Sequence, residues 1–264
     1  MYEFNVRRPG SVDLAVSALS SAEDGKLLAG GQTLLPTLKQ RLASPSDLVD
    51  LGEVAELKGI SDEGGAVKIG AMSTHAEVAT SDVVRSSIPA LAHLAGHIGD
   101  PQVRNRGTIG GSIANADPAA DYPAAIVGLN ATVHTNQRTI AADDFFTGMF
   151  ETALNDDEII TAVSFPKPTR AGYEKFPNPA SRYAIVGVMV AETGGETRVA
   201  VTGAAPSVFR AGDAESALSS NFSADALQSL SVSSANLNSD IHASAEYRAH
   251  LVGVMARRAA AAAT

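Results

Sequence analysis

Two glycine-rich segments constrain the fold of this chain more than any other feature. The first spans residues 29–36 and follows an apolar run, and the second spans residues 108–121. Each places a Gly-Gly pair beside a hydroxyl residue. Adjacent glycines let the backbone take positive φ and let a ligand approach the main chain closely. Because successive N–H groups in such a turn can bind an anion such as a diphosphate, the two segments predict one extended ligand held from both sides.

The overall composition limits the classes of protein to which the chain can belong. Its 264 residues, 45% of them hydrophobic, are enough for a sizeable core divided over two or three subdomains. The net charge of -9 disfavours nucleic acid as a partner. No apolar run approaches the roughly 18 residues of a membrane span, and the first residues lack the apolar core of a secretory signal. We therefore expect a cytoplasmic protein without a transmembrane segment.

The chain contains no cysteine. It therefore cannot hold an iron–sulfur cluster through thiolates, and it has neither disulfides nor a thiol nucleophile. His93 and His97 could share a helical face, but no nearby carboxylate completes a zinc triad. The Rossmann, P-loop and serine-hydrolase motifs are all absent. We expect no metal on this chain, and we do not expect its own side chains to carry out the chemistry.

The order of the expected elements changes along the chain. Residues 1–55 predict an α/β subdomain, residues 56–170 a second subdomain that opens with an antiparallel hairpin, and residues 171–264 a sheet with helices. Prolines and a glycine between 166 and 172 favour a boundary there. We expect strands at 4–9, 26–29, 47–51, 57–61, 66–71, 131–135, 158–165, 184–192 and 197–202, and helices at 11–20, 34–42, 75–80, 89–98, 122–128, 213–218, 224–230 and 243–262. Ser11 is the expected cap of the first helix, and Thr74 with Glu77 predicts a capping box.

The two glycine segments and three further stretches resemble the flavoprotein subunit of molybdenum hydroxylases, the family of carbon monoxide dehydrogenase and xanthine dehydrogenase. The further stretches are residues 69–77, 157–163 and 173–188, so the resemblance covers nearly the whole chain. It implies an α+β fold. That fold is a two-lobed FAD-binding fold of the vanillyl-alcohol-oxidase/PCMH type, followed by a small C-terminal antiparallel sheet with a helical bundle.

The resemblance also implies a function and partners. Relatives of this kind carry FAD and work beside a large molybdenum–pterin subunit and a small subunit with [2Fe–2S] clusters, as a dimer of heterotrimers. Substrate is hydroxylated at molybdenum, and electrons pass through the clusters to FAD and then to an external acceptor. The substrate is a small molecule such as an N-heterocycle, an aldehyde or carbon monoxide. The absence of cysteine is compatible with clusters that belong to another chain.

The resemblance further implies a set of FAD-binding residues. Asp121 would hold the cofactor or else cap the helix that follows, and Lys175 would lie near the flavin ring or else be a solvated lysine on a strand edge. Asn115 and Asp117 would contact the cofactor or only shape their turn. The complete set is Leu28, Ala29, Gly30, Gly31, Gln32, Thr33, Leu34, Ile98, Thr108, Ile109, Gly110, Gly111, Ser112, Asn115, Asp117, Asp121, Ile160 and Lys175.

Two other functions stay open at this point. The chain could be a stand-alone FAD-dependent oxidoreductase of the same fold, which would need its own acid or base beside the flavin. It could also be a non-catalytic binding protein in which the glycine segments are only turns. Nothing in the sequence identifies a substrate, because the substrate pocket of this family would lie on the large subunit.

Overall fold

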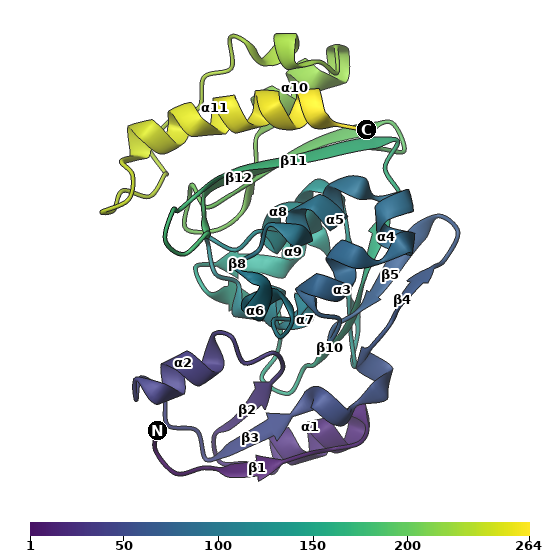
Figure 1. The fold of residues 1–264 in the computed structure, drawn as a ribbon, viewed down its shortest axis with the longest axis vertical. Coiled ribbons are helices and arrows are strands. Elements are labelled where there is room, and N and C mark those ends of the chain that lie inside the picture. The colour runs from purple at the N-terminus through teal and green to yellow at the C-terminus, as the bar shows by residue number, and fades with distance from the viewer.

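The computed structural model describes residues 1–264 and has three units, each built on its own sheet (Figure 1). The N-terminal unit contains a three-stranded parallel sheet, the middle unit a five-stranded antiparallel sheet, and the C-terminal unit a four-stranded antiparallel sheet. The middle unit lies between the other two in Figure 1, so the chain runs from one end of the molecule to the other.

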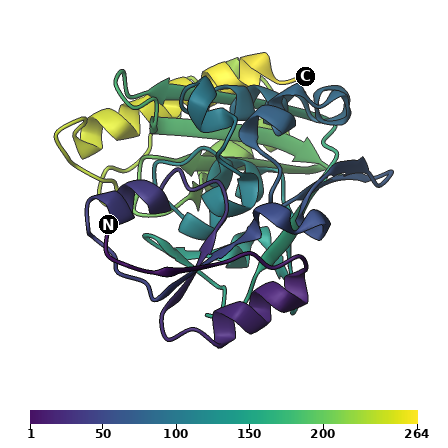
Figure 2. The ribbon, with the colours of Figure 1, turned by 60° about the horizontal axis from the view of Figure 1, so that its bottom comes forward.

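The N-terminal unit is a compact βαβαβ arrangement. Its sheet has the order β1-β3-β2, and the strands run between the two helices (Figure 2). Ser11 caps the first helix as predicted, because its side chain accepts a hydrogen bond from the N–H of Leu14 at 3.3 Å. The elements are β1 (Asn5–Arg7), α1 (Val12–Ser20), β2 (Gly25–Leu28), α2 (Leu34–Lys39), β3 (Asp47–Asp50), η1 (Leu51–Glu53) and η2 (Ala55–Leu57).

The middle unit places a group of short helices beside its sheet, whose order is β4-β5-β10-β6-β7. The predicted capping box is present, with Thr74 and Glu77 each bonding the backbone N–H of the other residue. The strands are β4 (Ile60–Asp62), β5 (Ala66–Gly70), β6 (Thr132–Thr135), β7 (Thr139–Ala141), β8 (Phe146–Gly148), β9 (Glu151–Thr152) and β10 (Ile160–Pro166). The helices are α3 (His75–Thr80), α4 (Asp82–Ser87), α5 (Pro89–Gly96), α6 (Pro101–Arg104), α7 (Ile109–Asn115), α8 (Tyr122–Gly128) and α9 (Ala142–Phe145).

The C-terminal sheet is buried on both faces. Along β12, Val188 and Val190 pack into a core formed with the C-terminal helices, whereas Met189 and Ala191 pack into the core of the middle unit. Alternate side chains of a strand point to opposite faces, so the nearly continuous apolar run of β12 follows from this double burial. The elements are β11 (Arg170–Pro177), β12 (Ala184–Thr193), β13 (Glu196–Thr202), β14 (Phe209–Arg210), α10 (Gly212–Ser220), η3 (Ala224–Leu227) and α11 (Ala245–Ala262).

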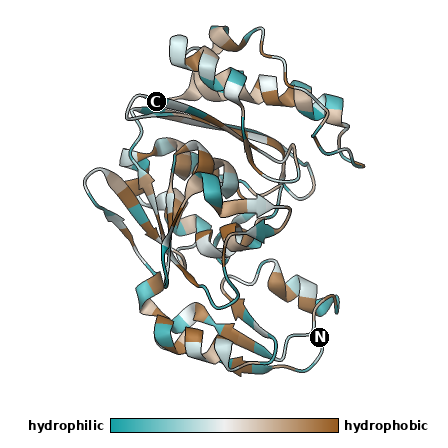
Figure 3. Ribbon diagram, turned by 180° about the vertical axis from the view of Figure 1, so that it is seen from behind, coloured by the Kyte–Doolittle hydropathy of each residue, from teal (hydrophilic) through white to brown (hydrophobic).

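Hydrophobic residues follow the strands of the parallel sheet and the helices of the middle unit (Figure 3). The largest core belongs to the middle unit and includes Tyr122, Phe145 and Phe165, all fully buried. This core fixes α5, α7 and α8, the helices whose ends border the site described below.

The structure corrects several expectations of element type and length. The second glycine segment, expected as a turn, contains the whole of helix α7 (Ile109–Asn115) and the turn that follows it. Within the expected helix at 224–230, only Ala224–Leu227 are helical, as the short 3₁₀ helix η3, and the expected C-terminal bundle consists only of η3, α10 and α11. Helices α4 and α6 were missed, because each is too short to show a hydrophobic period.

Gly172 provides a test of how tightly the C-terminal helix packs on its sheet. A Cβ at this position would meet the carbonyl group of Ala259 and lie 3.0 Å from the backbone nitrogen of Ala263. Backbone atoms cannot move aside cheaply, so Gly172→Ala should lower the free energy of unfolding by about 1–3 kcal/mol. Urea denaturation measures this change. The control is Gly212→Ala, where nothing lies within 4 Å. An equal loss of stability in both variants would contradict the explanation.

Candidate functional site

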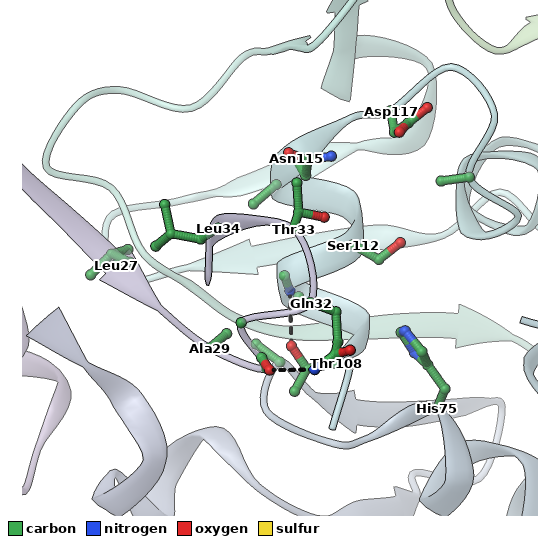
Figure 4. Close-up of a pocket in the computed structure, with 18 of the residues that line it drawn as sticks. Leu27, Ala29, Gln32, Thr33, Leu34, His75, Thr108, Ser112, Asn115 and Asp117 are labelled. Atoms are coloured by element: carbon green, nitrogen blue, oxygen red, sulfur yellow. Dashed lines mark hydrogen bonds between the residues drawn. The ribbon is translucent and has the colours of Figure 1, made fainter. Parts of the chain in front are cut away.

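A cleft of about 550 Å³ opens between the N-terminal and middle units, and both glycine segments line it (Figure 4). Its size lies within the range usual for pockets that bind small molecules and cofactors. One wall is the turn between β2 and α2, the opposite wall is α7, and residues Ser181–Tyr183 of the C-terminal unit complete one end.

The first wall carries a run of free backbone N–H groups. Gly31 has φ +72°, a conformation that L side chains rarely adopt, and this turns the chain sharply before α2. Its carbonyl and that of Thr33 accept bonds from α2. By contrast, none of the N–H groups from Gly30 to Leu34 donates to an oxygen of the chain. Backbone donors next to a cleft need a partner, and successive free N–H groups suit a phosphate or diphosphate.

Gly30 brings the two walls together. A Cβ on this residue would overlap the carbonyl of Arg106 and would lie 2.8 Å from the Cα of Gly107. Because these are backbone atoms, any larger residue would push the turn away from the segment that leads into α7. A glycine at position 30 is therefore required for the turn to approach the Arg106–Gly107 backbone this closely.

The second glycine segment works differently from the first, which corrects the expectation of a second anion-binding turn. The N–H groups of Ile109 and Gly110 donate to the carbonyls of Ser73 and Ala71, at 3.0 and 2.9 Å. The N–H of Gly111 donates to the Thr108 hydroxyl at 3.1 Å. These donors are already used. The glycines are needed for packing, because a Cβ on Gly110 would lie 2.6 Å from that of Ala71.

The polar side chains of the second wall come from α7 and the turn after it. Thr108, Ser112 and Asn115 line the cleft opposite Gln32 and Thr33 (Figure 4). Asp117 follows α7, accepts a bond from the N–H of Ala119 at 2.9 Å, and has a pKa raised by burial. This wall therefore offers hydroxyl and amide groups and a partly buried carboxyl group to a ligand.

Asp121 and Lys175 form a buried ion pair at one end of the cleft. Their side chains are 4% and 6% exposed, and Lys175 Nζ lies 2.8 Å from Asp121 Oδ1. Asp121 also accepts a bond from the hydroxyl of Tyr173 at 2.6 Å. Burial raises the pKa of Asp121, against the lowering effect of Lys175. Asp121 precedes α8 but makes no capping bond there, so its alternative interpretation as a helix cap is wrong.

His75 is a site residue that the sequence did not single out. It begins α3, lines the cleft and is buried. Burial, with a smaller effect of the nearby Arg104 charge, lowers the pKa of His75 to about 4. The imidazole is therefore neutral near pH 7, and its Nδ1 has no hydrogen-bond partner in the chain.

The other end of the cleft is lined by apolar side chains and one carboxyl group with a low pKa. Leu27, Ile159 and Ile160 line it, and Glu158 lies beside them. Hydrogen bonds from Arg138 lower the pKa of Glu158 most, and those from the Asn155 N–H and the Thr135 hydroxyl lower it further, to about 2. Glu158 is thus ionised at neutral pH and oriented by its partners.

Nearly all the residues expected at the site do line the cleft. The three exceptions are Leu28, which lies between the lining residues Leu27 and Ala29, Ile109, the fully buried first residue of α7, and Lys175, which stands behind Asp121. Several lining residues had no sequence signal of their own, because they reach the cleft from segments far apart in the chain. Among them are Lys26, His75, Val103, Glu158, Arg182 and Tyr183.

Comparison with known proteins assigns the chain to a family. Residues 2–168 match the FAD binding domain in molybdopterin dehydrogenase, and residues 171–263 match the CO dehydrogenase flavoprotein C-terminal domain. The chain belongs to the FAD-binding medium subunits of molybdenum hydroxylases. This confirms the resemblance, the expected α+β fold class and FAD as the cofactor of this chain. The family consists of oxidoreductases.

Individual relatives of this medium subunit cover almost the whole chain. The nicotine 6-hydroxylase medium subunit of Paenarthrobacter nicotinovorans is 40% identical over 95% of this chain and 93% of its own length. The carbon monoxide dehydrogenase medium chain of Hydrogenophaga pseudoflava is 36% identical over 97% of this chain and 95% of its own length.

Solved structures give the same result. Quinoline 2-oxidoreductase from Pseudomonas putida 86 matches with a TM-score of 0.87 and 32% identity, over 98% of this chain and 95% of that one. Reconstituted CO dehydrogenase from Oligotropha carboxidovorans matches with a TM-score of 0.88 and 35% identity, over 97% and 96%. In this medium subunit, no helix has the length and apolar character needed to cross a membrane.

The lowered pKa of His75 predicts how stability depends on pH. The unfolded chain takes up a proton on this histidine near pH 6.5, whereas the folded chain does so only near pH 4. The unfolded state therefore binds more protons in this window, and stability falls as the pH drops through it. Acidification from about pH 7 to about pH 4 should cost wild type about 3 kcal/mol more than His75→Gln. Urea denaturation of both proteins at several pH values measures the difference. Parallel pH curves would contradict the assignment.

Proposed function

We propose that this medium subunit is the electron-transferring flavoprotein of a heterotrimeric, cytoplasmic molybdenum hydroxylase. It would take electrons from the [2Fe–2S] clusters of a small partner and pass them to an external acceptor. A large molybdenum–pterin partner would hydroxylate a small molecule such as an N-heterocycle, an aldehyde or carbon monoxide. Relatives named as medium subunits of nicotine 6-hydroxylase and carbon monoxide dehydrogenase support this assembly. We further propose a dimer of such heterotrimers, and subdomains at 1–55, 56–170 and 171–264.

The free N–H groups from Gly30 to Leu34 carry the proposal for the cofactor site. They present a row of donors to the cleft at the point where Gly30 brings the walls together. A diphosphate is the part of FAD that such a row fits best. The hydroxyls of Thr33, Thr108 and Ser112 line the same stretch and would complete the set of hydrogen bonds.

The two ends of the cleft suit the two ring systems of FAD. Ile98, Tyr183 and Asp117 line one end, where an aromatic ring and groups able to hydrogen-bond would contact the flavin. Leu27, Ile159 and Ile160 line the other end, whose apolar surface would contact the adenine. When bound there, FAD supplies the capacity to accept two electrons and release them one at a time or together.

Gly31 gives a direct test of this site. A β-branched residue is strongly disfavoured at φ +72°, so Gly31→Val should distort the turn and misdirect its N–H groups. The dissociation constant for FAD, measured by flavin fluorescence on the full chain, should rise by at least about tenfold.

Gly194→Val is the matched control for this substitution. Gly194 also has positive φ, +60°, but it lies in the β12–β13 turn with nothing within 4 Å. Both variants should lose stability, but only Gly31→Val should lose FAD. Full FAD occupancy in Gly31→Val would refute the role of the turn.

The proposed assembly has a separate test. Protein isolated from its native source, without a tag on the partners, should contain a larger and a smaller chain together with flavin, iron and molybdenum. The isolated medium subunit should contain flavin only. Isolation as a single chain that oxidises a small molecule would instead favour a stand-alone flavoenzyme.

A further inference from the structure

Lys175 stands behind the cleft wall and uses its whole ammonium group within the chain. Its Nζ lies 2.8 Å from Asp121 Oδ1 and donates to the carbonyls of His97 and Arg182, each at 2.8 Å. A lysine ammonium has three N–H donors, and these three acceptors account for them. No donor remains for a ligand in the cleft.

The three acceptors belong to three separate segments that meet at the cleft. Asp121 precedes α8, His97 ends α5, and Arg182 lies in the connection between β11 and β12. Ile98 and Gly99, which follow His97, line the cleft, and so do Ser181 and Tyr183, the neighbours of Arg182. The ammonium thus joins two parts of the wall that no regular element connects.

Residues 178–183, here called the cover segment, form a turn that is closed on itself. The N–H of Asn178 donates to the backbone carbonyl of Tyr183 at 2.7 Å, and the N–H of Arg182 donates to the backbone carbonyl of Asn178 at 2.9 Å. Arg182 has φ 63°, which is uncommon for a residue with a side chain. Toward the α5 side, the cover segment is held by Lys175 and by one long bond, 3.5 Å, from Arg182 Nη1 to the carbonyl of Gly99. Of these two links, the one through Lys175 has the shorter hydrogen bond and the more buried donor.

Strand β11 supplies two side chains that bond Asp121, the ion-pair partner of Lys175. Tyr173 and Lys175 are two residues apart, so their side chains lie on the same face of the strand. Both bond the carboxyl group of Asp121, at 2.6 and 2.8 Å. Asp121 is therefore fixed by two donors from the C-terminal unit, and it in turn fixes the ammonium.

We propose that Lys175, oriented by Asp121, is a positioning residue that holds the cover segment at its end of the cleft. Its influence on bound FAD then passes through the placement of residues 181–183, and not through its own charge at the flavin. This inference rests on the proposed function for its effect on FAD. The placement of the cover segment itself does not depend on it.

The test variant combines Lys175→Met with Asp121→Asn, so that no buried charge is left without a partner. Because the chain has no cysteine, Ala180→Cys introduces a single position for a spin label in the exposed part of the cover segment. In the double variant the label should become more mobile, with or without FAD. The rate of FAD release should rise by about tenfold, as expected for the loss of a charged hydrogen bond. The reduction potential of the bound flavin should not change.

The control replaces another lysine–carboxylate pair, Lys167→Met with Asp62→Asn. This pair is 2.7 Å apart, far more exposed, and outside the cleft lining. It should leave label mobility and FAD release unchanged. Should the test variant fail to fold, Lys175→Gln, which keeps two donors, should show a smaller increase in both quantities.

Two results would overturn the inference. One is a label that is no more mobile in the test variant than in its parent. The other is a shifted reduction potential at an unchanged rate of FAD release, which would assign Lys175 a direct charge effect. A wild-type chain unable to bind FAD would refute the proposed function, and label mobility would still decide the role of Lys175.

Discussion

The site depends on the contact between two stretches of backbone at Gly30. The turn after β2 lies against the carbonyl of Arg106, where no side chain fits. This contact brings a row of free N–H groups opposite the side chains of α7, and it sets the width of the cleft between them. Without it the N-terminal and middle units would each carry half a site. The packing of Gly110 against Ala71 supports the same geometry, because it holds α7 against the segment that connects β5 to α3.

The two glycine segments contribute different kinds of groups to the cleft. The first leaves the N–H groups of the cleft-lining residues Gly30 to Leu34 unpaired, whereas the second pairs those of Ile109, Gly110 and Gly111 within the chain. The second segment therefore contributes side chains and a rigid support. An anion that binds here would be recognised by main-chain dipoles on one side and by hydroxyl and amide groups on the other. Such a site has no need of a basic residue in either segment.

The sequence predicts local structure well and tertiary placement less well. The Ser11 cap and the Thr74–Glu77 capping box were readable because each depends on residues close together in the chain. The second glycine segment was misread as a loop. Thr108 is in fact an N-cap, and a threonine directly before the apolar Ile109 could have indicated a helix start. The contacts of Lys175 could not be predicted, since His97 reaches it only through the packing of α5 against β11, and Arg182 only through the turn between β11 and β12.

The small size of the N-terminal unit has a consequence for its folding. The hydrophobic cluster of this unit contains only 7 buried residues, and one of them, Ile159, comes from the middle unit, whereas the cluster centred on the middle unit contains 30. A unit with so little buried surface is barely stable alone. Yet this unit contributes the whole turn whose N–H groups are free at the cleft. A ligand that bridges the cleft would therefore hold the N-terminal unit to the middle unit and stabilise its folded state. The ligand concentration would then set the folded fraction of the N-terminal unit. In a cell short of flavin, this unit would be the first part of the chain exposed to proteases, so cofactor supply would govern the lifetime of the subunit.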